Sequence, residues 1–474
     1  MGNEVTKQSI LLMSGGIHLH WCHFKGLKSL MVLVMSGMLS FIVHNSYCQT
    51  NLANLINYSL KYSPEINKSN LDVENTKYIR KEALGHGLPQ IEGSASYSKM
   101  SLNLDLPSSL TTYNPNEPVL TGLLSQIGSI DALYNASLGV QVTQLIYSQS
   151  YFAGLKVAKK TQEFYVSMKT KTEEDIIEEI ANNYYQLLSL EYQLGTVNKS
   201  LGNLKETFRI VDLNYRNDLV KESNVNRLKV TLTNLEVTSQ TLQNSIGLQL
   251  NYIKALVGMP IDTVLQIDSL TIKNSLSVDS IKFPSFSVDN VPAYQVLLKQ
   301  DNLYRQQVKL LQAEYIPTLA GYSKFNYSSY NTSSQIDKLT NMNTIGIQLN
   351  VPIFASGVKH AKVQQEKIKE LKLQQDLSKT KKLLLVNYNN AISEYQTSLC
   401  LLKVQNENRS LALKVYNQTN MQYTEGMASL ADLLNVNSDF LQADNSYNQQ
   451  ALKCNLAEIK ILKVLGNLKS LANN

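Results

Sequence analysis

Two segments of the chain alternate between apolar and polar residues with a period of two, which is typical of a strand with one apolar and one polar side. They are residues 138–146 and 345–353. The first has Leu138, Val140, Val142 and Ile146 on one face and Gly139, Gln141 and Thr143 on the other; the second has Ile345, Ile347, Leu349, Val351 and Ile353 on its apolar face. A partner strand is expected after Pro89 and after Pro317, in segments rich in Gly, Ser and Tyr.

Two environments suit such strands. One is an antiparallel sheet packed on a soluble core, which also has a single apolar side. The other is a transmembrane barrel, because a tilted strand needs about 9–11 residues to cross a bilayer. The many tyrosines favour the barrel. The only tryptophan, Trp21, lies in the expected leader, so an interfacial girdle of the mature chain would have to use Tyr and Phe.

Each strand pair is followed by a long stretch without proline, from Tyr147 to Tyr215 and from Phe354 to Tyr423. Both stretches are rich in Lys, Glu, Gln, Leu and Val, which predicts helices roughly 100 Å long at about 1.5 Å per residue. The chain is expected to turn back near Asp218 and near Gly426, because Asp and Gly suit the backbone of a tight turn. Each half therefore contains a hairpin of long antiparallel helices.

The returning helices carry apolar positions spaced alternately by three and four residues, which predicts coiled-coil seams with a period of 3.5. The first seam is Val225, Leu228, Leu232, Leu235, Ser239, Leu242, Ile246, Gln249, Ile253 and Leu256. The second, 208 residues later, is Leu433, Val436, Phe440, Ala443, Tyr447, Gln450, Cys454, Ala457, Ile461 and Val464. Cys454 lies in this seam, so we expect it to pack as a small hydrophobic residue.

The chain thus contains an internal repeat. Residues 138–147 match residues 345–354 at an offset of 207, and Tyr215 and Gly258 both match positions 208 residues later. The earlier landmark Leu88-Pro89 matches at an offset of 228, so the first half has 21 extra residues. These extra residues lie within 105–134, where Pro and Asn residues predict a surface loop.

The pattern predicts five parts. They are a leader with a signal peptide (1–48), a first repeat of helix, strand pair and helical hairpin (49–258), an irregular equatorial linker (259–290), a second repeat (291–466) and a C-terminal tail (467–474). The apolar run of residues 30–43 follows two lysines and predicts a secretory signal peptide cut after Cys48. An uncut anchor is an alternative, but the run is shorter than the roughly 20 residues that a spanning helix needs. A second alternative is that Cys48 carries a covalently attached lipid.

Composition and charge narrow the function. The formal net charge is +6 in 474 residues, with Lys and Arg scattered among Glu and Asp, so we expect no nucleic-acid partner. After removal of the leader, the remaining His and Cys residues are His86, His360, Cys400 and Cys454, which have no metal-ligand spacing. The sequence also lacks a Gly-rich phosphate loop and a nucleophile motif. We therefore expect neither an enzyme nor a cofactor or metal site.

A family resemblance rests on five segments in a fixed order: residues 58–66, residues 88–91, residues 256–260, residues 351–354, and residues 423–427 with Asp432. Together with the internal repeat, they resemble the TolC-like outer-membrane efflux protein family over essentially the whole mature length. The resemblance implies a membrane α+β fold: a trimeric outer-membrane β-barrel, with four strands per chain, continuous with a long periplasmic α-helical coiled-coil barrel. Closure by several copies also follows from physics, because four strands cannot close alone and an open sheet edge is not tolerated in lipid.

The implied function is passive exit of small molecules or exported substrates from a tripartite efflux or secretion system. The implied partners are two further copies of the chain, outer-membrane lipid, a periplasmic adaptor protein and an inner-membrane transporter that drives the flow. A secreted coiled-coil scaffold or adhesin is the alternative, but such a protein has no reason to interrupt its helices twice with matched amphipathic strands.

The family pattern also implies a pore gate at the inner end of the tunnel. Asp432 falls on an acidic gate position, and Asn435 occupies a second one where another Asp is common. Tyr423 matches a tyrosine that links hairpins, whereas Ala428 stands where an arginine is expected. The resemblance therefore implies a less acidic ring at the gate and an altered link between the hairpins. The alternative for Asp432 is a helix N-terminal carboxylate that the helix dipole stabilises.

Adaptor docking is expected at the turns of the two helical hairpins, by packing of helix hairpins against each other. The residues concerned are Asp218, Leu219, Val220, Gly426, Met427 and Ala428.

Overall fold

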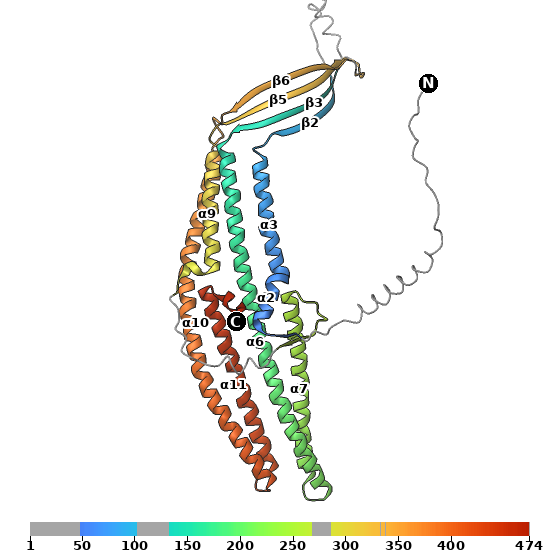
Figure 1. The fold of residues 1–474 in the computed structure, drawn as a ribbon, viewed down its shortest axis with the longest axis vertical. Coiled ribbons are helices and arrows are strands. Elements are labelled where there is room, and N and C mark those ends of the chain that lie inside the picture. The colour runs from blue at the N-terminus through green and yellow to red at the C-terminus, as the bar shows by residue number, and fades with distance from the viewer. Residues whose placement is uncertain (1–47, 102–131, 268–285, 332, 337, 474) are drawn as a thin grey trace, which may run out of the picture. The chain divides into compact units, whose positions relative to one another are not determined.

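The computed structural model describes residues 48–101, 132–267, 286–331, 333–336 and 338–473 (Figure 1). The chain divides into two units. The smaller unit comprises residues 1–49 and 264–266, of which residues 48–49 and 264–266 are described; they include most of β1 (Cys48–Thr50) and β4 (Leu265–Ile267), which pair with each other. The larger unit holds the remaining residues. The apolar run of the expected signal peptide, residues 30–43, lies outside the described residues.

The larger unit contains a four-stranded antiparallel sheet. Its strands, in spatial order, are β2 (Gln90–Ser101), β3 (Ala132–Tyr147), β5 (Thr318–Asn331) and β6 (Thr340–Asn350). The halves of the repeat meet where β3 pairs with β5, so β2 and β6 are the two edges. Each strand has at least 11 residues, which is enough to cross a bilayer at a tilt.

The two faces of this sheet differ as the alternation predicted. Residues opposite each other in an antiparallel pair point to the same face, so the register assigns every strand residue to a side. One face carries large apolar side chains that are exposed in the single chain: Ile91, Tyr97, Leu138, Val140, Phe325, Tyr327, Ile345, Ile347 and Leu349. The opposite face carries Ser94, Ser96, Gln141, Thr143 and Asn326.

The strand ends differ from expectation in two places. The predicted second strand ran to Ile353, but β6 ends at Asn350, because Pro352 has no N–H to donate to a ladder. The predicted loop ran to residue 134, yet β3 begins at Ala132. The rest of that loop, residues 102–131, lies outside the described residues.

Long helices make up most of the unit. The first half has α2 (Leu52–Tyr62), α3 (Pro64–Gly85), α6 (Gln149–Arg216) and α7 (Glu222–Val257). The second has α9 (Pro292–Ala313), α10 (Val358–Thr424) and α11 (Leu430–Leu465), with 3-10 turns η1 (Val288–Asn290) and η2 (Leu468–Ala472) at its ends. The 68 residues of α6 and the 67 of α10 make each helix roughly 100 Å long. In Figure 1, α7 returns along α6 and α11 along α10, as predicted.

Both predicted seams are confirmed by burial, because none of their residues is exposed. Leu228, Leu232 and Leu235 of α7 pack with Leu204 and Val211 of α6. In the second hairpin, Cys454 is buried with Ala457 and Ile461 against Tyr395 of α10. Cys454 is therefore a packed core residue, as expected.

The repeat is also visible where each hairpin ends. Gly258 and Gly466, 208 residues apart, both end a helix in the left-handed conformation, with φ of 80° and 68°. Each lies against a backbone carbonyl just before a proline that begins another helix, Tyr62 for Gly258 and Asn290 for Gly466. A side chain at either glycine would collide with that carbonyl. The same joint therefore occurs once in each half.

Candidate functional site

The turns of the two helical hairpins have the same backbone geometry. Asp218 and Gly426 are equivalent in the repeat, and both have positive φ, 59° and 77°. The next residue in each turn donates its N–H back to the helix: Leu219 to the carbonyl of Asn214 at 2.9 Å and Met427 to that of Gln422 at 2.8 Å. This left-handed turn explains why the sequence has Asp and Gly at these two positions.

The six predicted docking residues divide into two classes. Asp218, Leu219, Gly426 and Met427 are exposed, and the side chains of Leu219 and Met427 are 72% and 71% accessible. Val220 and Ala428 are half-buried, and Val220 packs against the apolar core of the first hairpin. Each turn therefore presents one large apolar side chain to solvent, next to a residue that holds the turn in place.

Asp432 lies in the first turn of α11, where it forms a capping box with Ser429. The Asp432 N–H donates to Ser429 Oγ at 3.1 Å, while the Ser429 N–H and hydroxyl donate to Asp432 Oδ2 at 3.2 and 2.6 Å. These hydrogen bonds hold the pKa of Asp432 below its usual value. The helix-terminal role considered for Asp432 is therefore present, in the form of a capping box. Its carboxylate is nevertheless exposed to solvent.

The sequence prediction missed one acidic residue on the same face of α11. Asp432, Asn435 and Asp439 are all exposed and follow one another by three and four residues, so they form one stripe of the helix. The spacing of seven residues from Asp432 to Asp439 was a signal that could have found it. Tyr423, by contrast, does not lie in this stripe. It is half-buried against the core that includes Leu430 and Leu434, and burial raises its pKa.

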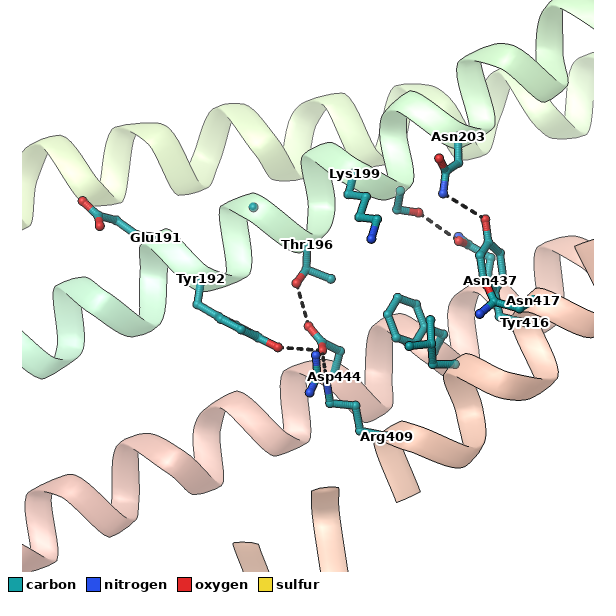
Figure 2. Close-up of a pocket in the computed structure, with 14 residues that line it drawn as sticks. Glu191, Tyr192, Thr196, Lys199, Asn203, Arg409, Tyr416, Asn417, Asn437 and Asp444 are labelled. Carbon is teal, nitrogen blue, oxygen red and sulfur yellow. Dashed lines mark hydrogen bonds and ion pairs between the residues drawn. The ribbon is translucent and has the colours of Figure 1, made fainter. Parts of the chain in front are cut away.

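A buried carboxylate joins the two hairpins (Figure 2). Asp444 of α11 accepts from Tyr192 Oη at 3.0 Å and Thr196 Oγ1 at 2.7 Å, both on α6, and from Arg409 Nε of α10 at 2.6 Å. The Arg409 guanidinium also lies 4.9 Å from the ring centroid of Tyr447. Burial, together with the Asp444 carboxylate, raises the pKa of Tyr192, so its phenol stays protonated and donates.

Three further hydrogen bonds continue this contact along α6. Ser200 Oγ donates to Asn437 Oδ1 at 2.9 Å, Asn448 Nδ2 donates to the carbonyl of Ser189 at 2.8 Å, and Asn203 Nδ2 donates to Tyr416 Oη at 3.3 Å. Together with the Asp444 contacts they form a series from residue 189 to residue 203, which we call the inter-hairpin ladder. A cavity of about 480 Å³ opens beside it, lined partly by Lys199, Asn417 and Phe440. The ladder residues are far apart in sequence, and none was predicted.

Two other features bear on function. Within the described part of the chain, no three His, Cys, Asp or Glu side chains gather as a metal site would require. None of the described helices is both long enough and apolar enough to cross a membrane.

Comparison with known proteins places these features in a family. The model of the outer membrane efflux protein family matches residues 289–467. Outer membrane protein TolC of Salmonella enteritidis is 19% identical over 434 residues, which cover 88% of this chain and 82% of that protein. By these matches the chain is similar to the outer membrane efflux protein family. Outer membrane protein TolC of Vibrio cholerae serotype O1 is also 19% identical, over 70% of this chain and 77% of that protein.

Solved structures of outer membrane channels have the same fold. The Campylobacter jejuni CmeC outer membrane channel superposes with a TM-score of 0.71 at 16% identity, covering 89% of this chain and 87% of that one. The open state of the Neisseria gonorrhoeae MtrE outer membrane channel superposes with a TM-score of 0.66 at 13% identity, covering 88% and 89%. The predicted fold, long helices plus four antiparallel strands per chain, is thus confirmed.

The match to the outer membrane efflux protein family also decides between the predicted classes of function. It confirms an outer membrane efflux channel with a periplasmic helical part, which is not an enzyme. The alternative of a secreted coiled-coil scaffold or adhesin is not supported.

Proposed function

We propose that three copies of this chain form one exit duct, through which solutes leave the cell passively. The observation that carries this proposal is the four-stranded sheet, whose two edges, β2 and β6, pair with no other described strand, and which has one exposed apolar face. A sheet in lipid must close, since an unpaired N–H or C=O costs several kcal/mol there. Pairing β6 of one copy with β2 of the next satisfies both edges and turns the apolar face toward lipid.

The helices then continue the barrel as a periplasmic tunnel, and its far end is the hairpin turns. We place the partners there: a periplasmic adaptor protein that packs against the turns, joined to an inner-membrane transporter that supplies the energy. The exposed Leu219 and Met427 support this placement, because an apolar side chain at a tip is what helix-hairpin packing would bury.

The gate belongs to the same end in this proposal. Asp432, Asn435 and Asp439 form the exposed stripe of α11 that narrows the tunnel, and the inter-hairpin ladder holds the hairpins in the narrow arrangement. With one Asn between two Asp, this stripe gives a weaker acidic ring than an all-Asp stripe would.

Two experiments test the proposal. Purified protein should run as a heat-modifiable trimer that requires detergent and forms pores in planar bilayers; a water-soluble monomer would refute it. For docking, Leu219→Glu and Met427→Glu should abolish efflux in cells while trimers still form. Val237→Glu is the matched control, because Val237 is also exposed on α7 but lies about four turns from the tip. Efflux that survives both tip substitutions would refute docking at the turns without affecting the trimer.

A further inference from the structure

The strands of the sheet carry very few charged side chains. In the described strands β2, β3, β5 and β6, the charged residues are Glu92, Lys99 and Lys324. The register places Glu92 and Lys324 on the polar face and Lys99 on the apolar face. Lys99 is near the end of β2, with its ammonium 5.6 Å from the ring centroid of Tyr134. The polar face therefore has one acidic and one basic residue per chain within the described strands.

These two charges lie in a single row across the sheet. Glu92 is opposite Gln141, Gln141 is opposite Lys324, and Lys324 is opposite Thr344. Opposed residues share a face and neighbouring strands are about 4.8 Å apart, so Glu92 and Lys324 stand roughly 10 Å apart with Gln141 between them. Both charged side chains are exposed, and neither forms an ion pair with any described residue.

The apolar residues on the opposite face decide which way the row points. Val140 and Phe325 are opposed to each other, they neighbour Gln141 and Lys324 in sequence, and both are exposed on the other side of the sheet. In a closed barrel that side meets lipid, so the row meets water in the lumen. Unpaired charges on the lumen wall act on every ion that passes near them, whereas on the lipid side they would cost several kcal/mol.

We propose that Glu92 and Lys324 form a charge-balanced band on the wall of the barrel lumen. This rests on the proposed trimer, in which three copies of the row give a band of three carboxylates and three ammonium groups. Because the signs balance, the band favours neither cations nor anions. The barrel therefore passes uncharged, zwitterionic and singly charged solutes of either sign, and selection by charge is left to the tunnel.

The test is the ratio of K⁺ to Cl⁻ permeability of the full-length trimer, from reversal potentials in planar bilayers under a KCl gradient. Low ionic strength is needed, because the Debye length is only about 10 Å at 0.1 M. Glu92→Gln should lower the ratio roughly twofold or more, and Lys324→Gln should raise it by a similar factor. The double variant should return to the wild-type ratio. Lys324→Arg, which keeps the charge, and Lys99→Gln, on the other face, should leave it unchanged.

A permeability ratio that neither single substitution changes would overturn the charge-balanced band, while the absence of any wild-type pore would instead refute the trimeric duct. Thiol labelling gives a second readout that does not depend on conductance. In a Cys400→Ser background, Lys324→Cys in liposome-embedded trimers should react with a water-soluble thiol reagent, and Val140→Cys should be protected. Protection of Lys324→Cys would place the row outside the lumen and overturn the proposal.

Discussion

Arg409 and Asp444 form an ion pair that joins the two helices of the second hairpin, with 2.6 Å between Nε and Oδ1; Asp444 is buried, whereas Arg409 is partly exposed. The same carboxylate accepts from Tyr192 and Thr196 of α6, so one side chain connects three helices. Such a pair stabilises little relative to an apolar replacement, but removing one partner leaves the other charge partly desolvated and without its partner. Of the residues in the inter-hairpin ladder, we therefore expect Asp444 to be the one whose substitution destabilises the protein most.

Asp444→Asn should destabilise the chain by about 2–3 kcal/mol. This is less than for a fully buried pair, because the Arg409 side chain is 31% exposed. The loosened hairpins should also raise single-channel conductance. Thermal unfolding and bilayer recording measure the two effects. Glu206→Gln is the control, since its pair with Arg209 is well exposed and its loss should leave both quantities unchanged. A destabilised variant with wild-type conductance would limit the ladder to a structural role.

The roles of Asp432 as cap and as gate can be separated with Ser429. Ser429→Ala removes the cap and should cost about 1 kcal/mol while leaving the Asp432 charge in place. Asp432→Asn removes the charge and should reduce the cation selectivity of the pore. The measurement is the reversal potential of each variant, together with its melting temperature. Unchanged cation selectivity in Asp432→Asn would show that Asp432 acts only as a helix cap and not in the gate.

The pKa of Asp432 adds a pH dependence. Because the folded pKa lies below the ordinary value of 3.8, the capping contribution is present above that value and is lost as the pH falls through the lowered pKa. The wild-type cap should therefore persist throughout the physiological range, and its loss in Ser429→Ala should be seen at neutral pH.

The glycine joints should tolerate no side chain. Gly466→Ala must adopt a left-handed backbone, which costs roughly 1–2 kcal/mol, and its Cβ collides with the carbonyl of Asn290. Gly258→Ala should behave in the same way against Tyr62. Gly247→Ala is the matched control: nothing lies near its Cβ, and alanine within α7 should stabilise by about 0.5–1 kcal/mol. Equal melting temperatures for Gly466→Ala and Gly247→Ala would contradict the joint.

Glu174 should make the stability of the helices depend on pH. Burial raises its pKa from 4.5 to about 7, despite the nearby Lys469 and Lys463. The folded pKa of Glu174 is above the unfolded one, so burying its ionised carboxylate costs stability. This cost is absent below about pH 4.5, grows as the pH rises and is complete above about pH 7. Glu174→Gln should then stabilise by up to about 3 kcal/mol at pH 8 and have no effect at pH 4. Melting curves at both pH values test this.

The neighbouring Glu173 provides the control for that experiment. Glu173 pairs with Lys469 at 2.5 Å, so Glu173→Gln removes an attraction and should not stabilise at pH 8. If Glu174→Gln changed the stability equally at pH 4 and pH 8, the raised pKa of Glu174 would be contradicted.

The features that could be predicted from the sequence are those that short stretches of the chain determine by themselves. The period of two in 138–146 fixed the faces of β3, and the 208-residue offset related Gly258 to Gly466 and Asp218 to Gly426. The ladder followed no such pattern, because Tyr192 and Asp444 are 252 residues apart and meet only when the hairpins pack. The end of β6 was misplaced for a local reason, since the alternation of apolar residues continues through a proline that cannot join the ladder.

The open edges of β2 and β6 have a consequence for inheritance. A chain with a substitution that prevents pairing at one edge can still pair through its other edge. In the proposed trimer it therefore assembles with normal copies, but the barrel cannot close. In a cell that makes equal amounts of normal and damaged chains, only about one ring in eight would escape a damaged member. Alleles that spoil a single edge should therefore be dominant, whereas alleles that prevent the chain from folding should be recessive.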